Sequence, residues 1–205
     1  MPTEKNSLRS RRAQVTRDVI LESARSLFAR QGYAATSVRP IAEEAGVAVA
    51  TLYSTFGSKQ GILIALVDTI REQTDAPALW DRIEAADDPA EIVRVAAHLR
   101  RQILERCGDI VATFREGAAG DPEVAAGYAE GQRRNRSGIE RMCSRLETLG
   151  ALRDGLPRER AVDGVAAMFA EESYEELTGP RSGWTPDEYE GWLAERLAGF
   201  LLKPS

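Results

Sequence analysis

Hydroxyl, aromatic and basic side chains alternate with apolar ones in the stretch VAVATLYSTFGSKQG, from Val47 to Gly61. Tyr53 stands between Leu52 and Phe56, whose spacing of four places both on one face of a helix. The Ala-Val-Ala run before them occupies positions where a surface helix normally carries polar residues. The stretch is therefore either a buried core segment or a helix whose outer face contacts another molecule.

Catalytic chemistry has little support elsewhere in the chain. His98 is the single histidine, which excludes an HExxH zinc site, a multi-histidine metal cluster and a Ser-His-Asp arrangement that does not use it. Neither GxxxxGK[ST] nor GxGxxG occurs, so no phosphate-cradling loop is expected. We expect no catalytic residue, no metal and no cofactor, and an enzyme is the weaker class of function.

The two cysteines and the chain's polarity indicate a reducing compartment. Cys107 and Cys143 match neither a metal-ligand spacing nor a CxxC redox pair, and they fit structural thiols. The polar, basic N-terminus has no apolar segment behind it, which argues against a secretory signal. No apolar run approaches the roughly 20 residues needed to span a bilayer. A cytoplasmic protein without membrane association is expected.

Charge is distributed unevenly along the chain. The net charge is −5, yet residues 1–60 hold nine Lys and Arg against five Asp and Glu, whereas residues 61–205 hold eighteen against twenty-seven. This asymmetry predicts a small basic module joined to an acidic one. Unevenly placed, solvated surface charge is the alternative explanation.

The apolar spacing is helical almost throughout. Ile20, Ala24, Leu27 and Phe28 predict a first helix that Thr16 caps and that Gly32 ends. Further helices are expected from the Thr36-Ser37 cap to Gly46, from Ala48 to Phe56, after Ser58, around Trp80, and over 89–107, 110–118, 122–150, 158–177 and 185–202. Gly108 is expected to separate two of them. Because no strand pattern is present, we expect an all-α fold with about nine helices.

Two short helices separated by a turn at Gly46 form the outline of a helix-turn-helix. Because any small helical bundle could show this outline, it carries little weight alone. We place the boundary between the small basic module and the larger acidic part after residue 60.

The segment GYAATSVRPIAEEAGVAVATLYSTFGSKQGIL resembles the DNA-binding segment of the TetR family of transcriptional regulators. The matching pattern is Gly-Tyr, Thr-Ser, Ile-Ala, Ala-Gly-Val, Thr-Leu-Tyr, Phe and Ser-Lys, and the resemblance covers about 50 residues from Val15 to Leu66. It implies a homodimeric repressor that binds double-stranded DNA at a near-palindromic operator and is released by a small-molecule effector.

Phosphate contacts implied by the resemblance must also make physical sense. Tyr53 is rotated away from Leu52 and Phe56, so its hydroxyl could donate to a phosphate. Lys59 is poorly placed for the dipole of the helix it begins, but a lysine there can reach a phosphate beside the helix N-terminus. Thr36 and Ser37 are expected to hold the DNA backbone by family resemblance.

Base contacts are expected from the start of the third helix. The resemblance assigns major-groove positions to Ala48, Val49, Ala50 and Thr51. This sequence departs from the usual serine near position 48 and glycine at position 50, and small apolar side chains there can touch thymine methyl groups. Thr55 replaces a usual histidine and remains a possible phosphate donor. Arg39 is the one nearby side chain suited to a bidentate guanine contact.

The basic arm KNSLRSRR carries Lys5, Arg9, Arg11 and Arg12. A flexible arm of this kind can lie in the adjacent minor groove. An ordinary solvated terminus is the alternative.

The resemblance implies that residues 1–60 are a DNA-binding domain with a basic N-terminal arm and that residues 61–205 are an effector-binding and dimerisation domain, which pairs through its last two helices. A dimer is also physically reasonable, because one recognition helix buries too little surface for specific binding. Part of the apolar stripe on these helices must be core rather than interface. The expected contact residues are Val162, Val165, Ala166, Phe169, Trp192, Leu193, Leu197, Phe200 and Leu201.

Effector contacts are expected among polar or aromatic residues on otherwise apolar helices. These are His98, Gln102, Phe114, Tyr128, Gln132, Asn135 and Met168. Each can equally be a packing or surface residue, and the effector itself is not identified.

Other functions remain open at this stage. A helix-turn-helix regulator could answer to a partner protein or to oxidation of Cys107 or Cys143, and it could activate rather than repress. A small-molecule-binding protein or enzyme could use the helix-turn-helix only as scaffold, which predicts no salt-dependent DNA binding.

Overall fold

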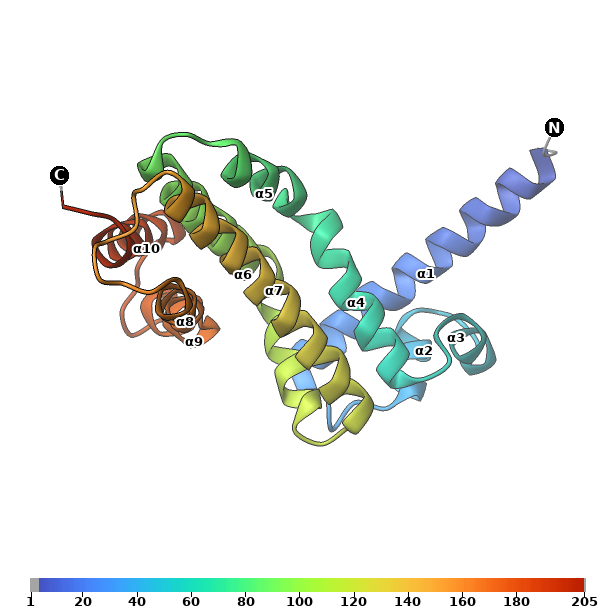
Figure 1. Cartoon of the computed structure of the whole chain (residues 1–205). Helices are drawn as coiled ribbons and strands as arrows, with labels where there is room; N and C mark the ends of the chain where they lie inside the picture. The colour runs from blue at the N-terminus through green and yellow to red at the C-terminus, as the bar shows by residue number, and fades with distance from the viewer. Residues whose placement is uncertain (1–3, 205) are drawn as a thin grey trace. The chain divides into compact units, whose positions relative to one another are not determined.

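The computed structural model describes residues 4–204, with side chains described from residue 10 onward. Ten helices follow one another in this part of the chain (Figure 1), which contains no β-strand and one isolated bridge between Leu152 and Leu202. The predicted all-α fold class is confirmed.

The chain forms two compact units. Unit 1 comprises Met1–Thr69 and Asp109–Tyr128, and unit 2 comprises Ile70–Gly108 and Ala129–Ser205. The helices α4 (Lys59–Gln73), α6 (Pro89–Ala118) and α7 (Pro122–Thr148) contribute residues to both units.

Unit 1 contains α1 (Glu4–Gln31), α2 (Val38–Glu44), α3 (Val49–Phe56) and the start of α4. In Figure 1 the short helices α2 and α3 lie beside α1 and α4. The predicted apolar face of α1 is buried. The core of the unit is formed by Ile20, Ala24, Leu27, Phe28, Tyr33, Ile41, Leu52, Ile62, Leu63, Leu66 and Phe114.

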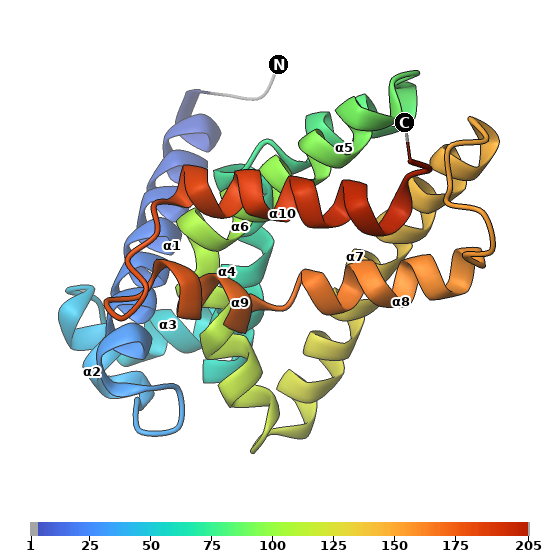
Figure 2. The ribbon, with the colours of Figure 1, turned by 90° about the vertical axis from the view of Figure 1, so that its left-hand side faces the viewer.

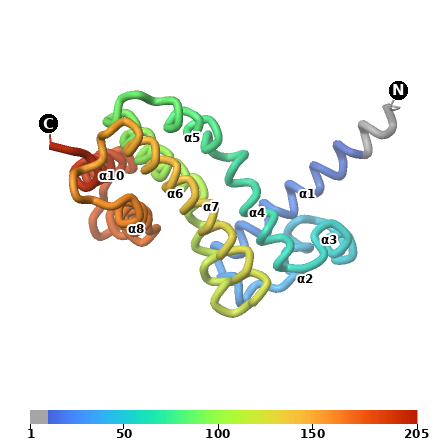
Figure 3. The backbone as a smooth tube through the Cα atoms, in the orientation of Figure 1, coloured from blue at the N-terminus to red at the C-terminus, as the bar shows by residue number. Residues whose placement is uncertain are grey.

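The end of α6 and the start of α7 complete unit 1 as a helical hairpin, whose course is visible in the tube of Figure 3. Asp121 starts α7, because its Oδ1 accepts from the N–H groups of Glu123 at 3.0 Å and Val124 at 3.3 Å. Arg25 of α1 binds Asp109 of α6 through two hydrogen bonds of 2.6 and 2.7 Å. This bidentate pair fixes the hairpin to α1.

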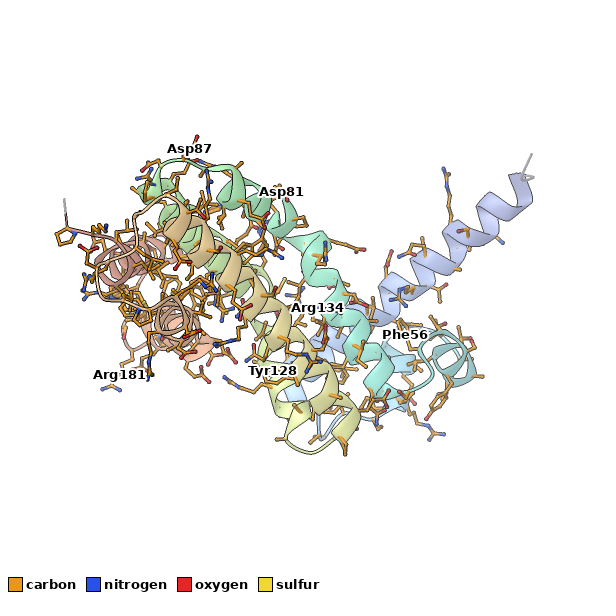
Figure 4. All side chains as sticks on the ribbon, viewed as in Figure 1. Phe56, Asp81, Asp87, Tyr128, Arg134 and Arg181 are labelled. Carbon is orange, nitrogen blue, oxygen red and sulfur yellow. The ribbon has the colours of Figure 1, made fainter. Side chains whose placement is uncertain are left out.

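Unit 2 is built from parts of α6 and α7 with α5 (Ala76–Ala85), α8 (Arg158–Met168), α9 (Glu171–Thr178) and α10 (Pro186–Leu201). In Figure 2, α8 and α10 run side by side. Their apolar side chains, drawn as sticks in Figure 4, fill the space between the helices. Thr185 and Glu188 form the predicted capping box at the start of α10.

Several glycines end helices where the sequence predicts. Gly32, Gly46 and Gly57 have φ values of 82°, 65° and 75°. These left-handed conformations suit glycine because it lacks a Cβ atom. The predicted short helix around Trp80 is also confirmed, as α5.

The start of the first helix was predicted wrongly. α1 begins at Glu4, and Thr16 lies inside it, with its hydroxyl donating to the Arg12 carbonyl at 2.9 Å. The predicted flexible arm is therefore helical in the described residues. The side chains of Lys5 and Arg9 lie outside the described residues, whereas Arg11 and Arg12 are exposed on the helix.

Two other helix boundaries also differ from prediction. Gly108 lies within α6, where Leu104, Cys107 and Ile110 continue one buried face across it. A glycine in a helix is unfavourable by only about 1 kcal/mol, which packing outweighs. The expected helix over 158–177 is instead divided into α8 and α9, with Ala170 in a non-helical conformation (φ −59°, ψ 135°) between them.

A tertiary contact accompanies the break between α8 and α9. Arg100 of α6 lies 3.7 Å from the Glu171 carboxylate, and both side chains are almost fully buried. The Arg100 guanidinium also lies 5.8 Å from the Phe169 ring centroid. These partners are about 70 residues away in sequence, so the local helical pattern could not reveal them.

Within the described range, none of the helices is both long and apolar enough to cross a lipid bilayer.

Candidate nucleic-acid interface

The turn between α2 and α3 sets the direction of α3. Gly46 adopts a φ of 65°, and the Val47 N–H donates to the Ala42 carbonyl at 3.0 Å. Ala48 then takes an extended conformation as the N-cap residue of α3. An alanine has no side-chain oxygen with which to cap the helix.

The two faces of α3 differ as the opening stretch suggests. Leu52 is fully buried, and Phe56 at the C-terminal end of α3 (Figure 4) is half-buried beneath the Arg17 guanidinium, 4.9 Å from its ring centroid. In contrast, Tyr53 is 51% exposed, and Ala48, Ala50, Ser54 and Thr55 are exposed as well. Thus α3 packs by one face and leaves the other free.

A groove of about 600 Å³ lies between the start of α2, the outer face of α3 and the first residue of α4. It brings together six of the residues predicted to contact DNA from three separate helix starts. Its lining residues are Ala34, Ala35, Thr36, Ser37, Val38, Arg39, Val49, Tyr53 and Lys59. The groove is not lined by the remaining predicted contacts, which are the N-cap residue Ala48 and, on α3, Ala50, Thr51 and Thr55.

Contacts with Tyr33 hold the Lys59 side chain in place. Its Nζ donates to the Tyr33 carbonyl at 2.9 Å and lies 4.0 Å from the Tyr33 ring centroid. Partial burial lowers the pKa of the Lys59 ammonium, and the carboxylates of Asp121 and Glu116 oppose that shift. The result is a positioned cation at the edge of the groove.

Several predicted hydroxyl donors already have intramolecular acceptors. Thr36 is 1% exposed, and its Oγ1 donates to the Gly32 carbonyl at 2.8 Å. Thr55 donates to the Thr51 carbonyl at 2.8 Å. Ser37 is exposed at the N-cap of α2 and makes no capping hydrogen bond with its side chain. Among these three, Ser37 is therefore the hydroxyl best placed to reach a phosphate.

The sequence did not predict that Tyr33 and Glu116 would hold the turn that forms one wall of the groove. Tyr33 is 4% exposed and packs on Phe28, and burial raises its pKa to about 12. Glu116 of α6 accepts hydrogen bonds from the turn that precedes α2. The Gly-Tyr pair signalled that Tyr33 mattered, but nothing local pointed to Glu116.

The predicted effector residues fall in different units. Phe114 and Tyr128 are in unit 1, where their rings meet edge to face at 5.8 Å. In unit 2, His98 Nδ1 lies 3.0 Å from Glu190, and Gln102 bonds both to the Asp75 N–H and to its carboxylate. Gln132, Asn135 and Met168 are also in unit 2. The effector site remains a prediction.

The predicted dimerisation residues divide by exposure. Most of them are buried within the single chain, namely Val162, Val165, Phe169, Leu193, Leu197 and Leu201. Ala166, Trp192 and Phe200 remain partly exposed. These three are the better candidates for contact with a second subunit, which is not tested by the single chain.

Comparisons with known proteins agree with this geometry. Residues 20–66 match the family model described as bacterial regulatory proteins, tetR family. The transcriptional regulator YvkB of Bacillus subtilis is 30% identical over 99 residues, which is 48% of this chain and 51% of YvkB. The regulator TtgR of Pseudomonas putida is 37% identical over 82 residues, 40% of this chain and 39% of TtgR. The chain thus spans about half or less of these relatives.

Solved structures extend the likeness in fold to nearly the whole chain. The complex of SmeT with triclosan, in which SmeT is a Stenotrophomonas maltophilia protein, has a TM-score of 0.73 at 20% identity. It covers 93% of this chain and 93% of SmeT. At 20% sequence identity, this similarity shows a shared fold and not a shared ligand or function. The match over residues 20–66 and the helix-turn-helix geometry identify this segment as similar to the N-terminal segment of the tetR family of bacterial regulatory proteins.

Proposed function

We propose that this protein is a sequence-specific DNA-binding transcriptional repressor that acts as a homodimer. The observation that carries the proposal is the groove, in which Ser37, Arg39, Tyr53 and Lys59 face one hollow from three helices. Hydroxyl and cationic donors grouped in this way suit the phosphates of one DNA strand. The exposed start of α3 beside them suits the major groove.

Within the proposal, the phosphate contacts place α3 and its small side chains read the bases. Ala48, Val49, Ala50 and Thr51 can touch thymine methyl groups, and Arg39 can form a bidentate contact with guanine. The helical arm with Arg11 and Arg12 would add further electrostatic contact to the DNA backbone.

A second subunit is needed because a single recognition helix buries too little surface for specific binding. Two copies would read half-sites about 34 Å apart along one DNA face, which predicts a near-palindromic operator. The exposed parts of Ala166, Trp192 and Phe200 on α8 and α10 support this pairing.

We further propose release from the operator by a small-molecule effector. Support comes from the solved structure of the fold neighbour SmeT with triclosan. An effector that binds more tightly to the dimer with poorly spaced recognition helices would lower DNA affinity by that difference. The effector's chemical class is not assigned.

Thiol oxidation is a weaker alternative for control. Cys107 and Cys143 are both fully buried, and burial raises the pKa of the Cys143 thiol to about 12. Because the thiolate is the reactive form, this environment disfavours oxidation. A partner protein remains a second alternative, and an enzymatic or purely ligand-binding role is the least favoured.

The proposal is tested by selecting duplexes from a random pool with the purified full-length protein. We expect an enriched palindrome bound by two subunits, with affinity falling steeply as salt rises. A shuffled version of the winning duplex is the control for non-specific binding. Failure to enrich any sequence at low salt, or equal affinity for the shuffled duplex, would contradict the proposal.

A further inference from the structure

The carboxylate of Glu116, near the end of α6, lies against the turn between α1 and α2. Its Oε2 accepts from the Tyr33 N–H at 3.1 Å, and its Oε1 accepts from the Ala34 N–H at 3.3 Å. Both donors follow Gly32, which has a left-handed φ of 82°. Successive N–H groups after a left-handed residue form a concave site for an anion, and Glu116 supplies that anion.

Gly32 gives this carboxylate room as well as forming the turn. A Cβ atom at Gly32 would lie 3.0 Å from Oε1 of Glu116. The missing side chain therefore leaves the space in which the carboxylate reaches the backbone.

The same peptide is held from its other end by α4. Lys59 donates to the Tyr33 carbonyl at 2.9 Å, while Glu116 accepts from the Ala34 N–H of the same peptide at 3.3 Å. The chain then continues directly into Ala34–Arg39, which form one wall of the groove. The position of that wall thus depends on where α6 and α4 hold Tyr33.

The charge of Glu116 works against DNA. An exposed carboxylate beside the proposed phosphate-binding groove repels phosphates, and its field reaches Lys59, where it opposes the lowering of the Lys59 pKa by burial. If Glu116 acted only through charge, its neutralisation would tighten DNA binding. If it acts through the hydrogen bonds to the turn, neutralisation would weaken binding. The two roles predict opposite signs.

We propose that Glu116 is a positioning residue for DNA binding, which orders the α1–α2 turn and so aligns Ser37 and Arg39 with the DNA backbone. The proposal rests on the DNA-binding function proposed above. It assigns to a residue of the α6–α7 hairpin a part in operator recognition without contact to DNA.

Glu116→Gln is the sharpest variant because it keeps the shape of the side chain. An amide has one acceptor oxygen, so in either orientation its NH2 group faces one of the two N–H donors. Glu116→Ala removes both acceptors at an exposed helical position where alanine is well tolerated. The matched control is Glu123→Gln. The charge of Glu123 adds to the effect of burial on the pKa of Tyr33, but Glu123 makes no hydrogen bond to the turn among the described contacts.

The test measures operator affinity of the full-length protein, referred to the active fraction from a stoichiometric titration, together with amide exchange of residues 32–40. We expect Glu116→Gln and Glu116→Ala to bind about five-fold more weakly, the equivalent of one lost hydrogen bond, with an unchanged salt slope. Exchange over residues 32–40 should accelerate. Glu123→Gln should bind as well as or better than the unmodified protein, with unchanged exchange.

Each result has a distinct meaning. Equal or tighter binding by Glu116→Gln, matching Glu123→Gln, would overturn the positioning role. A purely structural role would lower the melting temperature and the active fraction while leaving the affinity of the active fraction intact, and this result would also overturn it. If the unmodified protein selects no operator, the proposed DNA-binding function is contradicted. Amide exchange over residues 32–40 that is unchanged in Glu116→Gln would contradict the positioning role of Glu116 without any measurement on DNA.

Discussion

Lys59 has two roles at the scale of single residues. Its ammonium holds the Tyr33 carbonyl and lies over the Tyr33 ring, and it also lines the groove. An ammonium group has three N–H donors, so one held in this way keeps donors for a phosphate. The side chain is therefore pre-positioned rather than recruited from solvent.

Replacing Lys59 by glutamine should weaken operator binding about equally for all sequences. The slope of log affinity against log salt should become shallower by about 1 per binding site, because one counterion fewer is released. Lys203→Gln removes the same charge from unit 2 and serves as the control. An unchanged slope in Lys59→Gln would remove Lys59 from the phosphate contacts.

Cys143 makes stability depend on alkaline pH. Burial raises its pKa from an ordinary value of 9.0 to about 12. Above pH 9 the unfolded chain loses this proton while the folded chain keeps it. The stability from this thiol is therefore fully present below pH 9 and is lost as pH rises toward 12.

We expect urea unfolding to show a falling free energy of unfolding from pH 8 to pH 10. In Cys143→Ala the decline over this range should be shallower, whatever the variant's stability at pH 8. Tyr33, whose pKa is raised from 10.0 to about 12, adds a similar decline at higher pH. Equal slopes for the two proteins between pH 8 and pH 10 would contradict the assignment to Cys143.

At the scale of elements, close helix packing depends on glycines whose roles differ. The Phe200 ring of α10 lies against Gly164 of α8, where a Cβ atom would come within 2.3 Å of the ring. Gly108 in the middle of α6 has no atom within 4 Å of the same position. One glycine permits a helix contact, and the other only weakens a helix.

Alanine substitution should therefore have opposite effects at these two sites. We expect Gly164→Ala to lower the free energy of unfolding by about 1–3 kcal/mol through overpacking. Gly108→Ala should raise it by about 0.5–1 kcal/mol through helix propensity. Thermal and urea unfolding of both variants provide the measurement, and a stabilised Gly164→Ala would show that the Phe200 ring moves freely away.

At the scale of the whole molecule, unit 1 is assembled from two separate stretches of chain. Residues 109–128 supply Asp109 to Arg25, Glu116 to the α1–α2 turn and Asp121 to Gln60, with a 2.7 Å hydrogen bond in the last pair. They also bury Ile110 and Phe114. The helix-turn-helix therefore depends on a hairpin that follows it by about 50 residues.

A fragment that ends at Thr69 should consequently be much less stable than the same helices in the full chain. We expect reduced helical circular dichroism at 25 °C and a broad thermal transition, because the fragment loses both its polar partners and part of its core. A sharp transition at the temperature of the intact protein would show that the hairpin is dispensable for folding of residues 1–69.

Local physics explains why much of this protein was predictable from its sequence. Glycines at 32, 46 and 57 end helices because they accept left-handed φ values. Thr185 and Glu188 start α10 because each satisfies a free backbone donor of the other. The apolar period of α1 and α3 also determined which side chains face inward, including Leu52 inside and Tyr53 outside.

Other features depend on residues far apart in sequence, and only the tertiary structure decided them. α6 continues through Gly108 because packing on both sides of it outweighs a small propensity. The chain breaks before α9, where Glu171 meets Arg100. Glu116 reaches the turn at Tyr33 across 83 positions. The ends and faces of helices follow from interactions over a few residues, and these can be recognised in a sequence. Contacts between residues on distant helices follow from how the helices pack, and only the tertiary structure shows them.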